Sequence, residues 1–315
     1  MNAIKVLAPG GYTTIQDKGR FGFQHMGIPV SGVLDRFAFA LANLLVGNHE
    51  NTAVMELTVM GPSIEIRKEM DIALTGAKMG ITVNENPVDQ WRSIRVKKGD
   101  IVTIGQVQSG CRAYLSFSGG ISVPEVMGSF STYVGGKIGG FKGRPLQKDD
   151  IIETRDTPLL STGWAVPQKL IPAYPSHAVI RAIPGPQDDY FDTGLKTLFQ
   201  SEYMVTAKAD RMGYRLQGDP IPIKAGMPKS IVSEPSMPGS IQIPPDEQPI
   251  ILLVEQTVGG YAKIATIISS DLPVISQTTP GDTIRFEKID LNTAHGLIIE
   301  EQNKINTIKE IFSNH

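Results

Sequence analysis

The chain has 315 residues, of which 41% are hydrophobic, 20% are charged and 7% are aromatic. That length suffices for two globular domains of roughly 150 residues each. The 30 Lys and Arg residues nearly balance the 32 Asp and Glu residues, so a net charge of -2 argues against nucleic acid or an anionic membrane surface as the main partner. The 32 Gly and 22 Pro residues make up about 17% of the chain, against an average near 12%. This excess favours short strands and tight turns and excludes a helical bundle or a solenoid.

The cysteine content and the lengths of the apolar runs indicate in which cellular compartment the protein works. Cys111 is the single cysteine, which excludes an intramolecular disulfide and a cysteine-based zinc site. The first residues hold no apolar run of signal-peptide length, and the most apolar stretches, 37–46 and 250–254, are too short to span a bilayer. We therefore expect a cytoplasmic protein that does not enter a membrane.

The first part of the chain begins with a short strand at residues 4–7, followed by a polar, glycine-rich loop at 13–32. A helix is predicted over 36–46, with Asp35 as its N-cap and Gly47 as its C-terminal stop. Its residues are apolar nearly all round, so the helix should be buried. Asn43 is the one polar group inside it, and a buried Asn must find partners, either in the surrounding structure or on a ligand.

From residue 53 to residue 153 the pattern is that of β-structure. Apolar or alternating runs predict strands at 54–59, 63–66, 72–75, 81–83, 93–96, 101–104 and 113–117. Gly61-Pro62, Gly76 and Gly110 are among the turn signals between them. Closely spaced strands with such turns are typical of a barrel or a sandwich.

The second part follows a linker at 155–177 that is rich in Pro, Thr and Ser. A strand at 178–183 and a helix at 191–199 come first, and further strands are predicted through 205 and at 214–216, 241–243, 250–255, 265–268 and 283–287. An amphipathic terminal helix is expected to pack across this second β unit, on a face formed by Ala294, Leu297, Ile298, Ile305, Ile308 and Phe312. The predicted domains are thus a β-barrel unit at 1–165 containing the buried helix, and a β-barrel unit at 178–315 with the terminal helix.

Most catalytic and metal-binding signatures are missing from the sequence. The histidines stand singly, without the spacing of a metal site; they are His25, His49, His177, His295 and His315. Only His25, in the polar loop, is kept as a catalytic outsider, that is, a less favoured catalytic candidate. The glycine-rich run at 134–144 lacks the ending of a P-loop. It is either a flexible active-site loop carrying Lys137, Lys142 and Arg144 or a plain solvated loop.

Three polar segments are denser in functional side chains than turns require: residues 16–35, 128–133 and 233–263. Charged loops with glycine are common places for binding and catalytic groups. In the first segment Asp17 and Arg20 could instead form a salt bridge that fixes the loop. The second is a hydroxyl-rich strip, and the third contains the polar run from Glu234 to Lys263.

These segments lie within a series of motifs with a known counterpart. TTIQDKGRFGFQHMGIPVSGVLDRFAFALANLLVGN, CRAYLSFSGGI, GSFSTY, IPGPQDDYF, DRMGYRL and VSEPSMPGSIQIPPDEQPIILLVEQTVGGYAKIATIISSDLP occur in this order. They resemble the allophanate hydrolase subunit 2 family, also called the biotin-dependent carboxyltransferase family, from about Val6 to Phe286. The resemblance implies a mainly β protein of tandem cyclophilin-like β-barrel units with a few helices. Glu247 and Asp149 stand where the family usually has glycine.

The family includes the C-type subunit of an ATP-dependent 5-oxoprolinase, and the first functional hypothesis is that role. The resemblance implies a hydrolase complex that uses ATP to open 5-oxo-L-proline, a lactam, to L-glutamate. Its partners would be the subunit 1 type protein, which is the B-type subunit of 5-oxoprolinase, and the A-type subunit. Such a substrate needs donors for its carboxylate and amide oxygen and an acceptor for its amide N–H. Lys263, Glu234 and Asp35 are the catalytic candidates, and the substrate-binding candidates are Arg20, Asn43, Ser131, Thr132, Arg211, Gln242, Gln256 and Tyr261. Arg211 could instead form a structural ion pair with Asp210 or Asp219.

Two other family roles stay open. The chain could move a carboxyl group from carboxybiotin to urea or a related amide. It has no biotin carboxylase portion, and Lys78 lacks the preceding Met of a biotinyl-lysine signature, so biotin would arrive on a separate carrier. The chain could also be a non-enzymatic antagonist that binds a kinase inhibitor. The 5-oxoprolinase role ranks first because a free-standing chain of this length matches that arrangement best.

Overall fold

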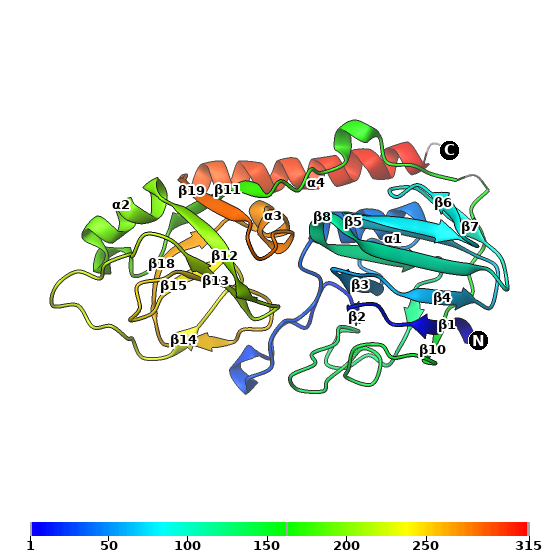
Figure 1. Ribbon diagram of the computed structural model, residues 1–315, viewed down its shortest axis with the longest axis horizontal. Coiled ribbons are helices and arrows are strands. Elements are labelled where there is room, and N and C mark those ends of the chain that lie inside the picture. Colours follow the sequence, from blue (N-terminus) through cyan, green and yellow to red (C-terminus); the bar gives the residue numbers. More distant parts are fainter. Residues whose placement is uncertain (1, 162, 314–315) are drawn as a thin grey trace. The chain divides into compact units, whose positions relative to one another are not determined.

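The computed structural model describes residues 2–161 and 163–313, which form two compact units (Figure 1). Unit 1 consists of Met1–Arg20, Ser31–Ala173 and Gln302–His315. Unit 2 consists of Phe21–Val30 and Tyr174–Glu301. The division into domains at 1–165 and 178–315 stays a proposal about independently folding parts.

Unit 1 is built on a ten-stranded antiparallel sheet. Its main path runs β2-β3-β8-β4-β1-β10-β9, while β5 pairs with β6, β7 and β8. The strands are β1 (Asn2–Ala8), β2 (Tyr12–Gln16), β3 (Val54–Thr58), β4 (Ser63–Ile66), β5 (Met70–Val83), β6 (Asn86–Val88), β7 (Ile94–Val96), β8 (Ile101–Phe117), β9 (Ile121–Ser122) and β10 (Ile151–Thr154).

Strands β5 and β8 correct the prediction of four separate strands in these regions. Each is continuous, over 14 and 17 residues, and crosses the glycine that the sequence had marked as a turn. Gly76 and Gly110 have φ of 85° and 80°, a conformation that glycine adopts without a steric cost. The β5–β8 register shifts between Gly76 and Lys78, so this glycine marks a β-bulge inside a strand.

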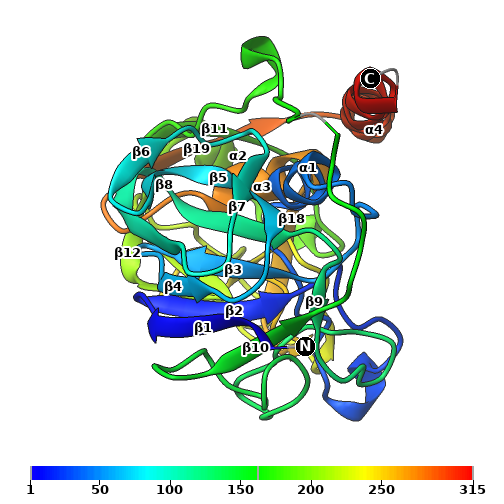
Figure 2. The same cartoon turned by 90° about the vertical axis from the view of Figure 1, so that its right-hand side faces the viewer.

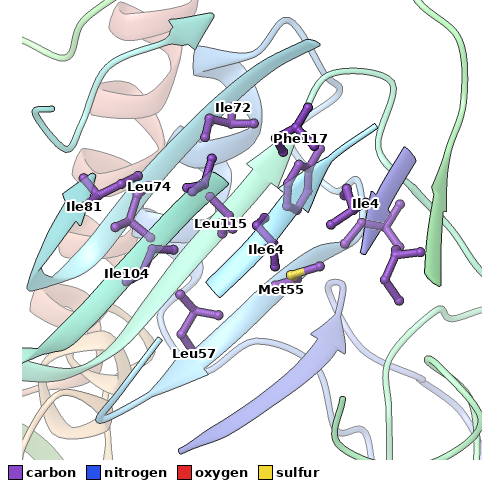
Figure 3. Packing of buried hydrophobic residues seen from close by; sticks show 14 of the residues in the cluster. Ile4, Met55, Leu57, Ile64, Ile72, Leu74, Ile81, Ile104, Leu115 and Phe117 are labelled. Atoms are coloured by element: carbon purple, nitrogen blue, oxygen red, sulfur yellow. The ribbon is translucent and has the colours of Figure 1, made fainter. Parts of the chain in front are cut away.

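The core of unit 1 lies on the inner face of this sheet, where aliphatic side chains such as Ile64, Leu74 and Leu115 interdigitate (Figure 3). Helix α1 (Arg36–Leu45) packs on β5 and β8 (Figure 2). Asp35 accepts a hydrogen bond from the Ala38 N–H at 2.9 Å, and Gly47 has φ of 72°, so the predicted N-cap and stop are confirmed.

Helix α4 (Leu291–Ser313) departs from its predicted packing. A second hydrophobic cluster of unit 1 is formed around α1 and includes Trp91 and Tyr114. Three residues of α4 are buried in this cluster: Ile305, Ile308 and Phe312. The Phe312 ring stacks on Trp164 with centroids 4.9 Å apart. Ile298, which was expected on the same buried face, is 45% exposed. The apolar periodicity identified the helix, but it did not reveal which hydrophobic surface its last turns would cover.

Unit 2 is a closed barrel of strand order β11-β18-β15-β16-β13-β12-β19, with β11 and β19 parallel. Its strands are β11 (His177–Pro184), β12 (Glu202–Ala209), β13 (Gly213–Gln217), β15 (Ser240–Ile243), β16 (Ile250–Leu252), β18 (Ala262–Ile267) and β19 (Thr283–Lys288). Two short strands outside the barrel, β14 (Glu234–Pro235) and β17 (Val258–Gly259), pair with each other. The predicted helix is α2 (Asp192–Gln200), and the short helix α3 (Leu272–Ser276) was not anticipated.

The expected fold class, mainly β with barrel-like units and a few helices, is confirmed by this architecture. Within the described ranges, no helix combines the length and apolarity needed to cross a membrane. In the same ranges, no group of three or more His, Cys, Asp and Glu side chains is arranged to hold a metal ion. Residue His315 lies outside the described residues.

Candidate functional site

The barrel of unit 2 holds a buried ammonium group paired with a carboxylate. Lys263 lies on β18, and its side chain is 4% exposed, whereas that of Glu234 on β14 is 41% exposed. Lys263 Nζ donates a hydrogen bond to Glu234 Oε1 at 2.5 Å. This carboxylate is the only partner of the Lys263 ammonium among the described residues, and an ammonium has three N–H donors. Lys263 thus keeps donor capacity for a ligand.

Gln187 joins the two members of this pair. Its Nε2 donates to Glu234 Oε1 at 3.0 Å, and its Oε1 accepts from the backbone N–H of Lys263 at 2.9 Å. The hydrogen bonds from Lys263 and then from Gln187 lower the pKa of Glu234 below its ordinary value, so this side chain stays a carboxylate. Gln187 was not among the predicted site residues, although it lies in the IPGPQDDYF motif.

Gln242 brings a further amide to the cluster. It is paired with Lys263 across the β15–β18 ladder and is 3% exposed. Its Nε2 is buried without a hydrogen-bond partner. A Cβ atom on Gly259 would lie 2.0 Å from Gln242 Nε2, so β17 passes directly against the end of this side chain. An unsatisfied buried amide costs about 1–3 kcal/mol and is a candidate ligand contact.

The segment around β17, which passes against Gln242, carries two more of the predicted residues, Gln256 and Tyr261. Gln256 Nε2 donates to the backbone oxygen of Val258 at 2.5 Å, and Tyr261 is 36% exposed. The β14–β17 pair is short, with Glu234 opposite Gly259 and Pro235 opposite Val258. Gln256 therefore stabilises its own turn, while the Tyr261 ring is open to solvent.

Arg211 forms an ion pair, but with a partner that differs from the two considered. Its Nε donates to Glu255 Oε1 at 2.6 Å, and both side chains are mostly buried. Asp210 accepts hydrogen bonds from the Met212 and Gly213 N–H groups instead, and Asp219 accepts one from Ser201. Glu255 is thus an ion-pair partner of Arg211 that the sequence did not suggest, and the pair is of the structural kind considered for this residue.

In unit 1 the hydroxyl-rich strip is organised by Asp17. This carboxylate accepts hydrogen bonds from Ser131 Oγ at 2.5 Å, Ser129 Oγ at 2.7 Å and the Phe130 N–H at 2.8 Å. Thr132 Oγ1 donates to the backbone oxygen of Ile15 at 2.8 Å. Ser131 and Thr132 are completely buried, so their hydroxyl groups serve the protein's own structure.

Arg20 lies beside this network and is also completely buried. Its Nε donates to the backbone oxygen of Val126 and its Nη2 to that of Ser131, both at 3.0 Å, and Nη1 has no partner. The predicted salt bridge with Asp17 is replaced by these carbonyl contacts. Burial lowers the pKa of Arg20, although the nearby Asp17 charge opposes the shift.

The remaining two predicted residues belong to α1 and its surroundings. Asp35 is completely buried, caps α1, and donates from its backbone N–H to Tyr114 Oη at 2.8 Å. The Asn43 side chain donates to the carbonyl oxygens of Glu50 and Thr52 and accepts from Asn48 and Ser116. Asn43 was expected to find its partners either in the surrounding structure or on a ligand. These protein contacts engage both Nδ2 and Oδ1, so the structural role accounts for all of its side-chain polar atoms.

The predicted residues therefore form separate groups. Lys263, Glu234 and Gln242 lie together in unit 2, while Arg20, Ser131 and Thr132 lie together in unit 1. His25, the catalytic outsider, is exposed on a short 3₁₀ helix. The unit 2 group combines a buried cation with spare donors, an ionised acceptor and an unpartnered amide. This set suits recognition of an uncharged amide, which presents one oxygen acceptor and one N–H donor.

The chain is similar to known proteins over nearly its whole length. Residues 26–288 match the family model described as carboxyltransferase domain, subdomain A and B. The 5-oxoprolinase C subunit of Haemophilus influenzae is 33% identical over 310 residues, which cover 98% of each chain. That of Escherichia coli is 37% identical over 294 residues, covering 92% of this chain and 93% of the relative.

A solved structure extends the comparison to a larger enzyme. The crystal structure of Kluyveromyces lactis urea carboxylase matches 98% of this chain with a TM-score of 0.91 at 32% identity. The chain spans 29% of that protein.

Two β units, one of them a closed barrel, are thus the architecture of a carboxyltransferase-type domain. The chain belongs to the family of carboxyltransferase domains that contain subdomains A and B. Its similar relatives include enzyme subunits.

Proposed function

We propose that this protein is the C subunit of an ATP-dependent 5-oxoprolinase, which opens 5-oxo-L-proline to L-glutamate together with partner subunits of types A and B. The match with two 5-oxoprolinase C subunits over more than nine-tenths of both chains supports the assignment. The structural observation that carries it is the Lys263–Glu234 pair with Gln242 beside it, since these groups complement a lactam.

In this proposal the lactam lies against the cluster of unit 2. The Lys263 ammonium and the Gln242 Nε2 group donate to the lactam oxygen, and the Glu234 carboxylate accepts from the lactam N–H. The lowered pKa of Glu234 keeps this acceptor ionised at neutral pH. Asp35, Asn43, Ser131 and Thr132 are left out, because the protein's own hydrogen bonds already engage their side chains.

The chemistry has to activate an unstrained amide. Transfer of the γ-phosphoryl group of ATP to the lactam oxygen releases ADP and makes the ring carbon electrophilic. Water then adds to that carbon, the C–N bond breaks with a proton passing to nitrogen, and an acyl phosphate forms. A second water hydrolyses the acyl phosphate to the carboxylate and phosphate. As the lactam oxygen takes up the phosphoryl group, donors fixed beside it stabilise the negative charge of the phosphoryl oxygens, and that is the role proposed for Lys263 and Gln242.

The proposal is tested with the complete set of subunits. Co-purified A, B and C type chains are incubated with 5-oxoproline and ATP, and glutamate and ADP are measured with and without this chain. We expect glutamate to form only with the complete set and in step with ADP. A complete set that forms no glutamate would refute the proposed function.

The urea carboxylase match favours a second candidate function, carboxyl transfer to urea or a related amide. Carboxybiotin on a carrier protein would then be the donor substrate. The same Lys263, Glu234 and Gln242 groups would bind the acceptor amide, which has the oxygen and N–H of a lactam. Amide-dependent loss of the carboxyl group from carboxylated carrier would favour this candidate over the first.

A further inference from the structure

The glycine-rich loop of unit 1 lines a cavity away from the groups assigned to substrate above. The cavity has a volume of about 710 Å³. Residues 139–143 of the loop form one wall, together with Lys137 and Val126. Residues 149–151 and Glu153 are among those on another part of the lining. The sequence left open whether this loop has a function or is simply solvated.

The loop presents a run of free backbone donors to the cavity. The N–H groups of residues 139–142 donate to no other described residue, whereas the Gly143 N–H donates to Gly139 O at 2.9 Å. Gly139, Gly140 and Lys142 have φ of 64°, 53° and 59°, while Phe141 between them does not have a positive φ. From Gly140 to Lys142 the backbone thus alternates between left-handed and ordinary conformations, and such alternation forms concave arrangements of successive N–H groups that bind anions.

The buried guanidinium of Arg20 supplies a second, independent observation. A Cβ atom on Gly139 would lie 2.6 Å from Arg20 Nη2, so the guanidinium lies directly against the loop backbone. Val126, which lines the cavity, provides one of the carbonyl oxygens that hold it. Arg20 Nη1 is buried and unpartnered, so the guanidinium keeps a donor that the protein does not use.

The remaining charges around the cavity permit an anion. Lys137 and Lys142 are exposed on the loop wall. Of the acidic lining residues, Asp150 is held by both Nη groups of Arg144 at 2.7 Å, and Asp149 is held by Lys5 at 2.9 Å. Glu153 is exposed, and its carboxylate can turn to solvent.

We propose that residues 139–142, backed by Arg20, form an oxyanion-binding site that takes a phosphate or a carboxylate group. The backbone N–H groups bind the oxygens, Lys142 adds an exposed positive charge above the Phe141 ring, and Arg20 supplies a buried one from behind. Glycine at 140 is required because a side chain there would be strained and would strike Thr132. The site does not depend on the proposed function, since its residues are outside the unit 2 cluster.

The test is titration of the full ¹⁵N-labelled chain, followed through its backbone amide signals. Inorganic phosphate and acetate are the separate probes, at constant ionic strength. We expect saturable shifts centred on residues 139–142 with at least one of them, and the effective probe identifies the chemical source of the oxyanion. Lys142→Gln should weaken binding about three- to tenfold, as expected for loss of one exposed charge.

Lys148→Gln is the matched control, because it removes an exposed lysine from the adjacent turn that does not line the cavity. It should leave the affinity unchanged. Gly140→Ala should weaken binding at least about tenfold through distortion of the loop, with its other amide signals showing that the chain is folded. Absence of saturable shifts with both probes, or equal affinities for the Lys142→Gln and Lys148→Gln variants, would overturn the proposal.

Discussion

Asp17 is the residue whose substitution should reveal most about how unit 1 is held together. Its Oδ1 accepts from Gly19 N, Ser129 Oγ and Ser131 Oγ, and its Oδ2 accepts from Phe130 N. The side chain is 4% exposed. Asp17→Asn keeps the shape and the Oδ1 contacts, but it turns an amide N–H toward the Phe130 N–H.

The expected cost follows from these contacts. One buried N–H without an acceptor costs about 1–3 kcal/mol, and the remaining hydrogen bonds lose the strengthening that a charged acceptor gives. The buried Arg20 also loses its nearby negative charge, a change comparable to removing one partner of a buried pair. We expect a total destabilisation of about 3–5 kcal/mol. Ser129→Ala removes one donor to Asp17 and the acceptor of the Ser131 N–H, and it keeps the Asp17 charge, so it should cost less, about 1–3 kcal/mol.

Urea unfolding followed by tryptophan fluorescence measures this difference. Both tryptophans of the chain, Trp91 and Trp164, belong to the second hydrophobic cluster of unit 1, so their signal reports on that unit. A destabilisation below about 1 kcal/mol for Asp17→Asn, or one equal to that of Ser129→Ala, would refute the reasoning.

Two further predictions concern unit 2. Glu247 has φ of 60°, so Glu247→Gly should relieve about 1–2 kcal/mol of backbone strain. Part of this gain is offset because glycine gives the unfolded chain more conformational entropy. The melting temperature measured by calorimetry should therefore rise by about 1–4 °C. Glu247→Ala is the control and should not raise the melting temperature, because it removes the carboxylate but keeps the strain. Burial raises the pKa of Tyr203 to about 12, above its ordinary value near 10. The neutral phenol therefore favours the folded state below pH 10, and this contribution to stability is lost as the pH rises from about 10 to about 12. Tyr203→Phe should therefore flatten the decline of stability over this pH range in urea unfolding, and an unchanged pH profile would contradict the assignment.

Local rules identified much of the fold. The N-cap at Asp35, the stop at Gly47 and most of the strand positions follow from residues close together in the sequence. The errors came from tertiary packing. Gly76 and Gly110 have the local signature of turns, but their strands continue because pairing between β5 and β8 extends on both sides. Likewise, an amphipathic pattern contains no information on which cluster receives Ile305 and Ile308.

The candidate site was predictable in its residue types but only partly in its geometry. Polar density and family motifs selected Lys263, Glu234 and Gln242, which are neighbours in unit 2. Gln187 was missed because its contacts span 47 and 76 residues of sequence. Ser131 and Thr132 were chosen for their hydroxyl groups, yet those groups are used by Asp17 and by the backbone of β2. Sequence shows which polar groups exist, and only the folded chain shows which remain available.

The central claim is that Lys263 acts on a lactam within an ATP-dependent complex. The most direct measurement is glutamate formation from 5-oxoproline by complexes that contain either Lys263→Ala or Lys208→Ala, the latter removing an exposed lysine of β12. The account predicts a rate at least about 100-fold lower for Lys263→Ala at saturating substrate, as for loss of one fixed donor to the transition-state charge, and an unchanged rate for Lys208→Ala. Equal rates for the two complexes would contradict it.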